Sequence, residues 1–88
     1  MKFLVTPRFA RDIKGLHPAE KNALDEQLRA LVDQPEAGDM KKGDLAGVRV
    51  VKYKHNTQQW LLAHEVGEAA IILLAHGSDK NFYRNSKR

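Results

Sequence analysis

The sequence of 88 residues contains no cysteine and no long apolar segment. Without cysteine, disulfide bonds and metal sites built on thiolates are excluded. The longest apolar run extends from Ala69 to Ala75, far shorter than the ~20 residues that a membrane-spanning helix needs. The start of the chain also lacks the apolar core of a signal peptide. We therefore expect residues 1–88 to form one soluble domain in the cytoplasm, without membrane contact.

Motifs of nucleotide binding, serine catalysis and metalloprotease chemistry are also lacking. The chain has no P-loop, no GxGxxG, no GxSxG and no HExxH. None of the histidines forms an HxxxH pair, which would place two imidazoles on one helix face. The sequence therefore predicts neither a metal site nor an organic cofactor.

The pattern of apolar residues predicts the order β-α-α-β-β-β in an α+β fold. A short apolar strand at 2–5 precedes Thr6 and Pro7, which are typical of the N-cap and first position of a helix. A second amphipathic helix begins at Pro18 and ends before Pro35. The rest is predicted as a loop and three strands, at 36–47, 48–54, 59–66 and 69–76. We expect a helical hairpin on one face of a small, mostly antiparallel sheet, which the first strand joins at an edge.

Two turns fix the expected register of the three later strands. If Asn56-Thr57 and Gly67-Glu68 are both two-residue turns, Lys54 lies opposite Gln59, and Gln59 lies opposite His76. A slip of one residue in either turn would exchange the two faces of a strand.

In this register the two faces of the sheet have different chemistry. Tyr53 and Trp60 point to the apolar face on which the helices are expected to pack. Lys52 and Lys54 share the other face, because alternate residues of a strand point to the same side. Four apolar residues are predicted beside them: Val50, Leu61, Ile72 and Leu74. A face that is partly basic and partly apolar, if exposed, indicates a surface that binds a partner.

Positive charge is concentrated in the second half of the chain. Residues 1–44 contain eight Lys and Arg and eight acidic residues, whereas residues 45–88 contain seven and three, so the net charge of +4 comes from the second half. Such a distribution suits a polyanion such as RNA or DNA, or an acidic protein partner.

Five residues are candidates for chemistry on a phosphate. Lys52 and Lys54 are suited to holding a phosphate and stabilising its developing charge, although lysines also protect exposed edge strands from pairing. His76 has the pKa range of a general acid or base, or it simply ends the sheet. Tyr83 and Arg84 are suited to stacking on a base and binding phosphate, or they pack as part of a tail.

Several segments in this order resemble the RelE/ParE superfamily of toxins from bacterial type II toxin–antitoxin modules. The resemblance covers nearly the whole chain, through "FARDIKGL", "LDEQLRALVDQPEAGD", "GDLAGVRVVKYK" and "GSDKNFYR". It implies a helical hairpin on a small antiparallel sheet. The chain departs from the pattern of cutting members at Leu61, where they often carry arginine, and at Asp79, where related chains often carry histidine.

The resemblance implies a toxin held inactive by a cognate antitoxin, and it leaves two activities open. One is a ribosome-dependent mRNA endonuclease without a metal, and the other is a non-enzymatic inhibitor of DNA gyrase. A non-toxic RNA-binding domain is a third alternative. Under the first, the expected catalytic residues are Lys52, Lys54, His76, Tyr83 and Arg84. The expected RNA-binding residues are Arg49, His55, Gln59, Lys80 and Lys87. The antitoxin is expected to contact Val50, Leu61, Ile72 and Leu74.

Overall fold

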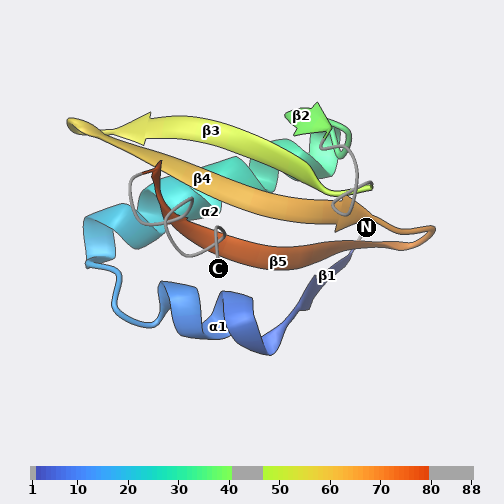
Figure 1. Ribbon diagram of the computed structural model, residues 1–88, viewed down its shortest axis with the longest axis horizontal. Coiled ribbons are helices and arrows are strands. Elements are labelled where there is room, and N and C mark those ends of the chain that lie inside the picture. The colour runs from blue at the N-terminus through green and yellow to red at the C-terminus, as the bar shows by residue number, and fades with distance from the viewer. Residues whose placement is uncertain (1, 41–46, 80–88) are drawn as a thin grey trace.

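The two helices pack on one face of a five-stranded mixed sheet (Figure 1). The computed structural model of the protein describes residues 2–40 and 47–79. The helices are α1 (Pro7–Ile13) and α2 (Pro18–Asp33). The strands are β1 (Lys2–Val5), β2 (Asp39–Met40), β3 (Arg49–His55), β4 (Gln58–Val66) and β5 (Ala70–Ser78). No helix within these ranges is long and apolar enough to cross a membrane.

The order of the strands in the sheet is β1-β5-β4-β3-β2. β1 lies at one edge of the sheet, as the sequence predicts, where it runs parallel to β5, and the other neighbours are antiparallel. The short strand β2, which pairs with the start of β3, lies in a segment that the sequence predicts as loop. The predicted α+β fold is therefore confirmed, with one additional edge strand.

The chain enters α1 through a cap that also joins the helix to the sheet. The Thr6 hydroxyl oxygen accepts a hydrogen bond from the Phe9 N–H at 3.2 Å, which satisfies a free donor of the first turn. The same hydroxyl donates to the Leu73 carbonyl oxygen at 2.8 Å. Pro7 follows at the first helical position, as predicted. This cap fixes the direction in which α1 leaves β1.

Apolar side chains of both helices and three central strands form the main core. Its fully buried members are Phe9, Leu24, Leu31, Leu62, Ile71 and Leu73, with Tyr53 at its margin. A second, smaller cluster lies on the opposite face of the sheet and contains Val50, Leu61, Ala63 and Ala75. The alternation of adjacent residues such as Leu61 and Leu62 between the two clusters is the period of two expected of a strand.

The first hairpin has the predicted register, and the second does not. Lys54 lies opposite Gln59, across a turn in which Asn56 adopts a φ of 57°. In the second hairpin His76 lies opposite Leu62, and Leu61 lies opposite Gly77. The predicted pairs Gln59–His76 and Leu61–Leu74 are therefore wrong.

Two local features cause this change of register. The pair nearest the second turn is Val66–Ile71, so four residues, 67–70, separate the paired positions where two were predicted, and the register shifts by two. A bulge then adds Leu74 to β5, since Ala63 faces Ala75 while His64 faces Leu73. Together they move the partner of Leu61 from position 74 to position 77. Because this shift of three residues is an odd number, His76 turns to the face that carries the helices.

Candidate functional site

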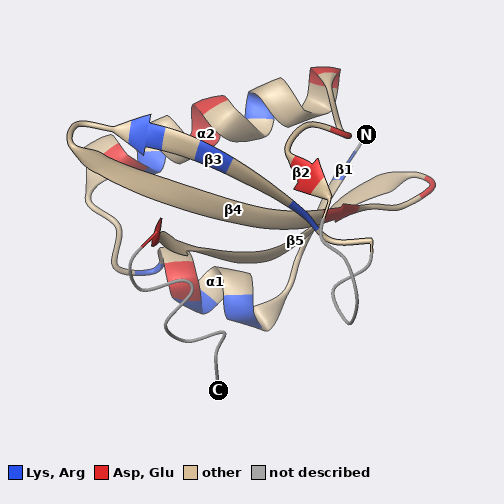
Figure 2. Ribbon diagram, turned by 45° about the horizontal axis from the view of Figure 1, so that its top comes forward, with Lys and Arg blue, Asp and Glu red and all other residues tan. Residues whose placement is uncertain are grey.

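β3 presents two lysines on the face of the sheet opposite the helices. Lys52 and Lys54 alternate with Val51 and Tyr53, which pack against the main core. Both lysines are exposed, and neither forms an ion pair with a residue in the described ranges. In Figure 2 the blue of Lys and Arg recurs along β3, whereas the central parts of β4 and β5 are tan. Two free cations two residues apart on a rigid strand are suited to binding an anion such as phosphate.

Of the predicted RNA-binding residues within the described ranges, only Gln59 joins these lysines. It lies opposite Lys54 and therefore on the same face. Arg49 points to the helical side, where its Nη1 donates to the Glu36 carbonyl oxygen at 2.8 Å. His55 lines a groove between β3 and α2, with Ala23 among its neighbours.

The structure places His76 in the core, on the other side of the sheet from Lys52 and Lys54. Its side chain is only 4% exposed. Its Nε2 shares a hydrogen bond of 2.6 Å with the Tyr53 hydroxyl, and its ring stacks on Trp60 at a centroid distance of 5.1 Å. In this position His76 has a structural role. It cannot reach a substrate on the face of the sheet that carries Lys52 and Lys54, which is called the lysine face below.

A carboxylate of α1 also binds His76, through its backbone. Asp12 Oδ2 accepts a hydrogen bond from the His76 backbone N–H at 3.0 Å, beyond the point where β1 stops pairing with β5. Three residues surround His76: Asp12, Trp60 and Tyr53. This arrangement was not predicted from the sequence. No residue of the sequence signals this arrangement, because it depends on the bulge that brings His76 to the side of Tyr53.

Burial keeps both members of the Tyr53–His76 pair uncharged at neutral pH. It lowers the pKa of His76 to about 4, although the negative charges of Asp12 and Glu20 act in the opposite direction. Burial also raises the pKa of Tyr53 to about 12, and the charge of Glu20 adds to this effect. A neutral imidazole with so low a pKa is a poor general acid near pH 7.

His64 is the second fully buried histidine, at 0% exposure. Its Nε2 lies 2.8 Å from the Pro35 carbonyl oxygen, so this nitrogen carries the proton and donates it. Burial lowers the pKa of His64, as does the nearby charge of Arg49, while the hydrogen bond to Pro35 opposes the shift. His64 therefore ties β4 to the end of α2 rather than serving the lysine face.

Comparison with known families identifies the chain. The model of the family described as ParE-like toxin of type II bacterial toxin–antitoxin system matches residues 3–87. The chain belongs to this family. It is thus a toxin of a type II toxin–antitoxin system, and the resemblance drawn from the sequence is confirmed.

A solved structure has the same fold as this ParE-like toxin. It is described as the solution structure of the conserved hypothetical protein HP0894 from Helicobacter pylori. The two chains align with a TM-score of 0.54 and 20% sequence identity, over 91% of this chain and 96% of that chain. At this identity the likeness concerns the fold alone. A search of curated proteins finds no match.

Membership in the family implies an antitoxin partner for this ParE-like toxin. Of the four apolar residues predicted to contact it, Ile72 and Leu74 are partly buried. Val50 and Leu61 are 3% and 0% exposed, so the prediction that they lie on an open surface is wrong. They belong to the smaller apolar cluster, where Ala63 and Ala75 pack against them.

The remaining predicted site residues of the toxin are Lys80, Tyr83, Arg84 and Lys87, which lie outside the described residues. Within the described ranges, no three His, Asp or Glu side chains are grouped as a metal site would require. The chemistry that the described part of the site offers is therefore charge: two exposed ammonium groups and a partly buried amide on one face of the sheet.

Proposed function

We propose that this ParE-like toxin cleaves mRNA on the ribosome, with the scissile phosphate bound by Lys52 and Lys54. The single observation that supports the proposal is the pair itself. Both side chains are exposed, point to the same face and form no ion pair within the described ranges. The amide of Gln59 lies opposite Lys54 and offers both a donor and an acceptor to a neighbouring nucleotide. Action on the ribosome implies a cytoplasmic location.

The proposed reaction is an internal transfer of the phosphate. The ribose 2′-oxygen forms a bond to phosphorus, and the bond to the 5′-oxygen of the next nucleotide breaks. The proton of the 2′-hydroxyl goes to a base, and the departing oxygen takes up a proton, which leaves a 2′,3′-cyclic phosphate and a 5′-hydroxyl. Two ammonium groups would stabilise the extra negative charge on phosphorus without a metal. The C-terminal group of the proposed site is Tyr83 or Arg84.

In this mechanism His76 does not touch the substrate. Its ring is buried on the helical side, and its low pKa keeps it neutral. Its predicted catalytic role therefore finds no support in its position, and we assign it to the packing of β5 beneath the lysine face.

A reconstituted translation reaction with a defined mRNA tests the proposal. Cleavage sites are mapped by primer extension, with ribosomes present or omitted. Wild-type toxin is expected to produce new 5′ ends only with ribosomes, and Lys52→Ala/Lys54→Ala is expected to reduce cleavage roughly 100-fold or more. Lys2→Ala/Arg29→Ala is the matched control, since it removes two exposed positive charges elsewhere. An intact message with wild-type toxin, or equal losses in both variants, would contradict the proposal.

Inhibition of DNA gyrase is the second candidate function. Two observations favour it: the family is described by its likeness to ParE, and His76 lies away from the lysines. Under this alternative the toxin would block supercoiling by purified gyrase and leave mRNA intact in the translation reaction. Growth arrest on induction would separate either activity from a non-toxic RNA-binding role.

The antitoxin is proposed to cover the face that carries the lysines. Ile72 and Leu74 offer partly accessible apolar contacts there, and Val50 and Leu61 lie beneath in the smaller cluster. Hydrogen exchange of the toxin with and without its cognate antitoxin tests this assignment. Protection is expected in β3 and β5, and unchanged exchange in both strands would contradict it.

A further inference from the structure

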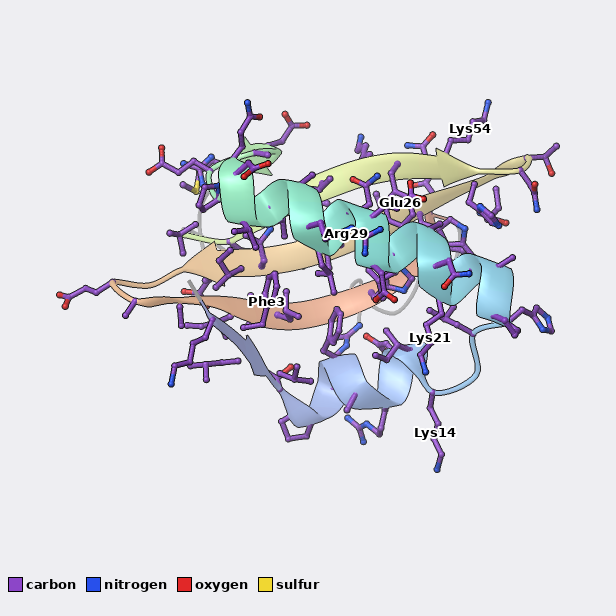
Figure 3. The ribbon with its side chains drawn as sticks, turned by 180° about the vertical axis from the view of Figure 1, so that it is seen from behind. Phe3, Lys14, Lys21, Glu26, Arg29 and Lys54 are labelled. Carbon is purple, nitrogen blue, oxygen red and sulfur yellow. The ribbon has the colours of Figure 1, made fainter. Side chains whose placement is uncertain are left out.

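A second group of basic side chains follows α1 from its first turn to its C-terminal end and continues at the start of α2. It consists of Arg8, Arg11, Lys14 and Lys21, all exposed, and is called the basic corner below. The spacing of the first three, at i, i+3 and i+6, places neighbouring members on adjoining parts of one helix surface. Figure 3 shows Lys14 and Lys21 at this same end of the molecule.

Two acidic residues of this region, Asp12 and Glu20, form hydrogen bonds within the fold. Asp12 accepts the His76 backbone N–H at 3.0 Å and lies 3.5 Å from the Arg8 guanidinium. Glu20 Oε1 accepts the His17 backbone N–H at 3.0 Å, within the first turn of α2. Both carboxylates are partly buried, so they contribute less negative charge to the surface than the sequence suggests.

The basic members of the corner are turned outward. Arg11, Lys14 and Lys21 are exposed and form no ion pair within the described ranges. The first half of the sequence is neutral by count, yet its charges are separated in space. The corner therefore groups exposed cationic side chains that the count by halves does not reveal.

The outer side of α2 provides the contrast. There Arg29 is accompanied by three exposed acidic residues, Asp25, Glu26 and Asp33. Figure 3 shows Arg29 and Glu26 on α2, with Glu26 toward β3, where it lines a groove together with Lys54 and His55. Asp25 also lies four residues from Lys21, so exposed positive charge without a nearby acidic side chain is concentrated at Arg11 and Lys14.

We propose that the basic corner binds the phosphate backbone of folded RNA, as a second contact separate from the Lys52–Lys54 face. This inference rests on the proposed function in that it takes the target of the toxin to be ribosomal. Binding of a phosphate backbone needs clustered Lys and Arg and no apolar anchor. The large apolar side chains that the described chain exposes are Leu4, Val5, Val32 and Met40, and none belongs to α1 or to residues 14–17.

The composition of the corner favours a paired backbone over a single strand or an acidic protein, and the proposed ribosomal target makes that backbone RNA. A single strand is bound by aromatic side chains on which its bases stack. The described Phe, Tyr and Trp side chains are buried or partly buried, and Phe9 of α1 points into the core. An acidic protein partner would require an apolar centre to its interface, which the corner lacks.

Fluorescence anisotropy with a fluorescein-labelled 20-base-pair RNA duplex tests the proposal. Affinity is measured between 50 and 200 mM KCl for the wild type, for Arg11→Gln/Lys14→Gln and for the control Lys2→Gln/Arg29→Gln. The corner variant is expected to bind more weakly, with a slope of log K against log salt reduced by about 2, one unit for each lost phosphate contact. The control is expected to match the wild type. All four residues are exposed, and circular dichroism verifies that each variant is folded.

Three results would overturn the inference. One is an unchanged slope in the corner variant, and another is an equal loss in the control, since that would reflect net charge alone. The third is binding of a DNA duplex of the same sequence, or of polyglutamate of equal charge, as tightly as the RNA duplex.

The duplex assay and the translation reaction test two separate proposals, and each can be refuted without the other. An intact message together with a reduced slope in the corner variant would refute cleavage and keep the RNA contact. Cleavage at the ribosome with an unchanged slope would keep the proposed function and refute the corner.

Discussion

The two faces of the sheet are built by the same strands and yet do different work. On β3, Val51 and Tyr53 point into the main core, while Lys52 and Lys54 between and beyond them point to the opposite face. One face provides stability through apolar burial and a buried hydrogen bond between Tyr53 and His76. The other carries a smaller apolar cluster and, beside it, two lysines that form no ion pair within the described ranges. Stability and binding can therefore be changed separately by substituting adjacent residues.

The largest expected effect distinguishes the two apolar clusters. Leu61 and Leu62 are both 0% exposed, but only Leu62 belongs to the main core. We expect Leu62→Ala to lower the free energy of unfolding by about 3–4 kcal/mol, because the large rigid side chains around it leave a cavity. Leu61→Ala should lower it by about 2 kcal/mol, since two of its cluster partners are alanines. Urea denaturation followed by circular dichroism measures both, and a larger loss for Leu61→Ala would invert the assignment of the faces.

The next largest effect is a loss of stability at acidic pH. The pKa of His76 is about 4 in the folded protein and about 6.5 in the unfolded chain, so the unfolded chain binds more protons between these values. The stability that the neutral imidazole contributes is complete above about pH 6.5 and is lost as the pH falls toward 4. The loss is on the order of 3 kcal/mol. The lowered pKa of His64 acts in the same direction.

His76→Phe is the variant that isolates this effect. Denaturation curves are compared between pH 7 and pH 4, and the variant should lose less stability over that interval than the wild type. Identical pH dependence in the two proteins would mean that the imidazole of His76 is already charged or accessible in the fold.

A smaller effect is expected for the hydroxyl group of Tyr53. Tyr53→Phe keeps the ring in the core and removes the partner of the His76 Nε2 atom. A buried ring nitrogen without a partner lowers the free energy of unfolding by about 2 kcal/mol. Thermal or urea denaturation checks the value. Full stability in the variant would show that water or another group replaces the phenol.

The smallest expected effect is that of the two lysines on stability. Lys52→Ala/Lys54→Ala should change the free energy of unfolding by less than about 0.5 kcal/mol, because both side chains are exposed and unpaired within the described ranges. The same variant is expected to lose RNA cleavage. A substantial loss of stability would mean that the lysine face is structural, which would remove the basis for comparing the two faces.

The local signals of the sequence were sufficient for most of the fold. Thr6 and Pro7 placed the start of α1, and the Asn56-Thr57 turn placed β3 against β4 in the correct register. These features depend on residues close to one another in the chain. The register of β5 depends instead on a turn with four residues between the paired positions and on the bulge at Leu74, and no nearby residue signals either.

This difference decided how much of the candidate site could be predicted. The side of Lys52, Lys54 and Gln59 follows from the first hairpin and was correct. The side of His76 follows from the second hairpin, and the odd shift carried it from the predicted face into the core. The bonds that then fix it, to Tyr53 and Asp12, join residues more than twenty positions apart.

The side chains that follow β1 have a further consequence for the edge of the sheet. β5 extends beyond Leu73, where its pairing with β1 ends, so its outer backbone groups would otherwise be open to a strand of another molecule. The Thr6 hydroxyl donates a hydrogen bond to the carbonyl oxygen of Leu73, and the carboxylate of Asp12 accepts one from the N–H of His76. From Leu73 to His76, this edge is therefore protected against intermolecular β-pairing and the aggregation that such pairing would start.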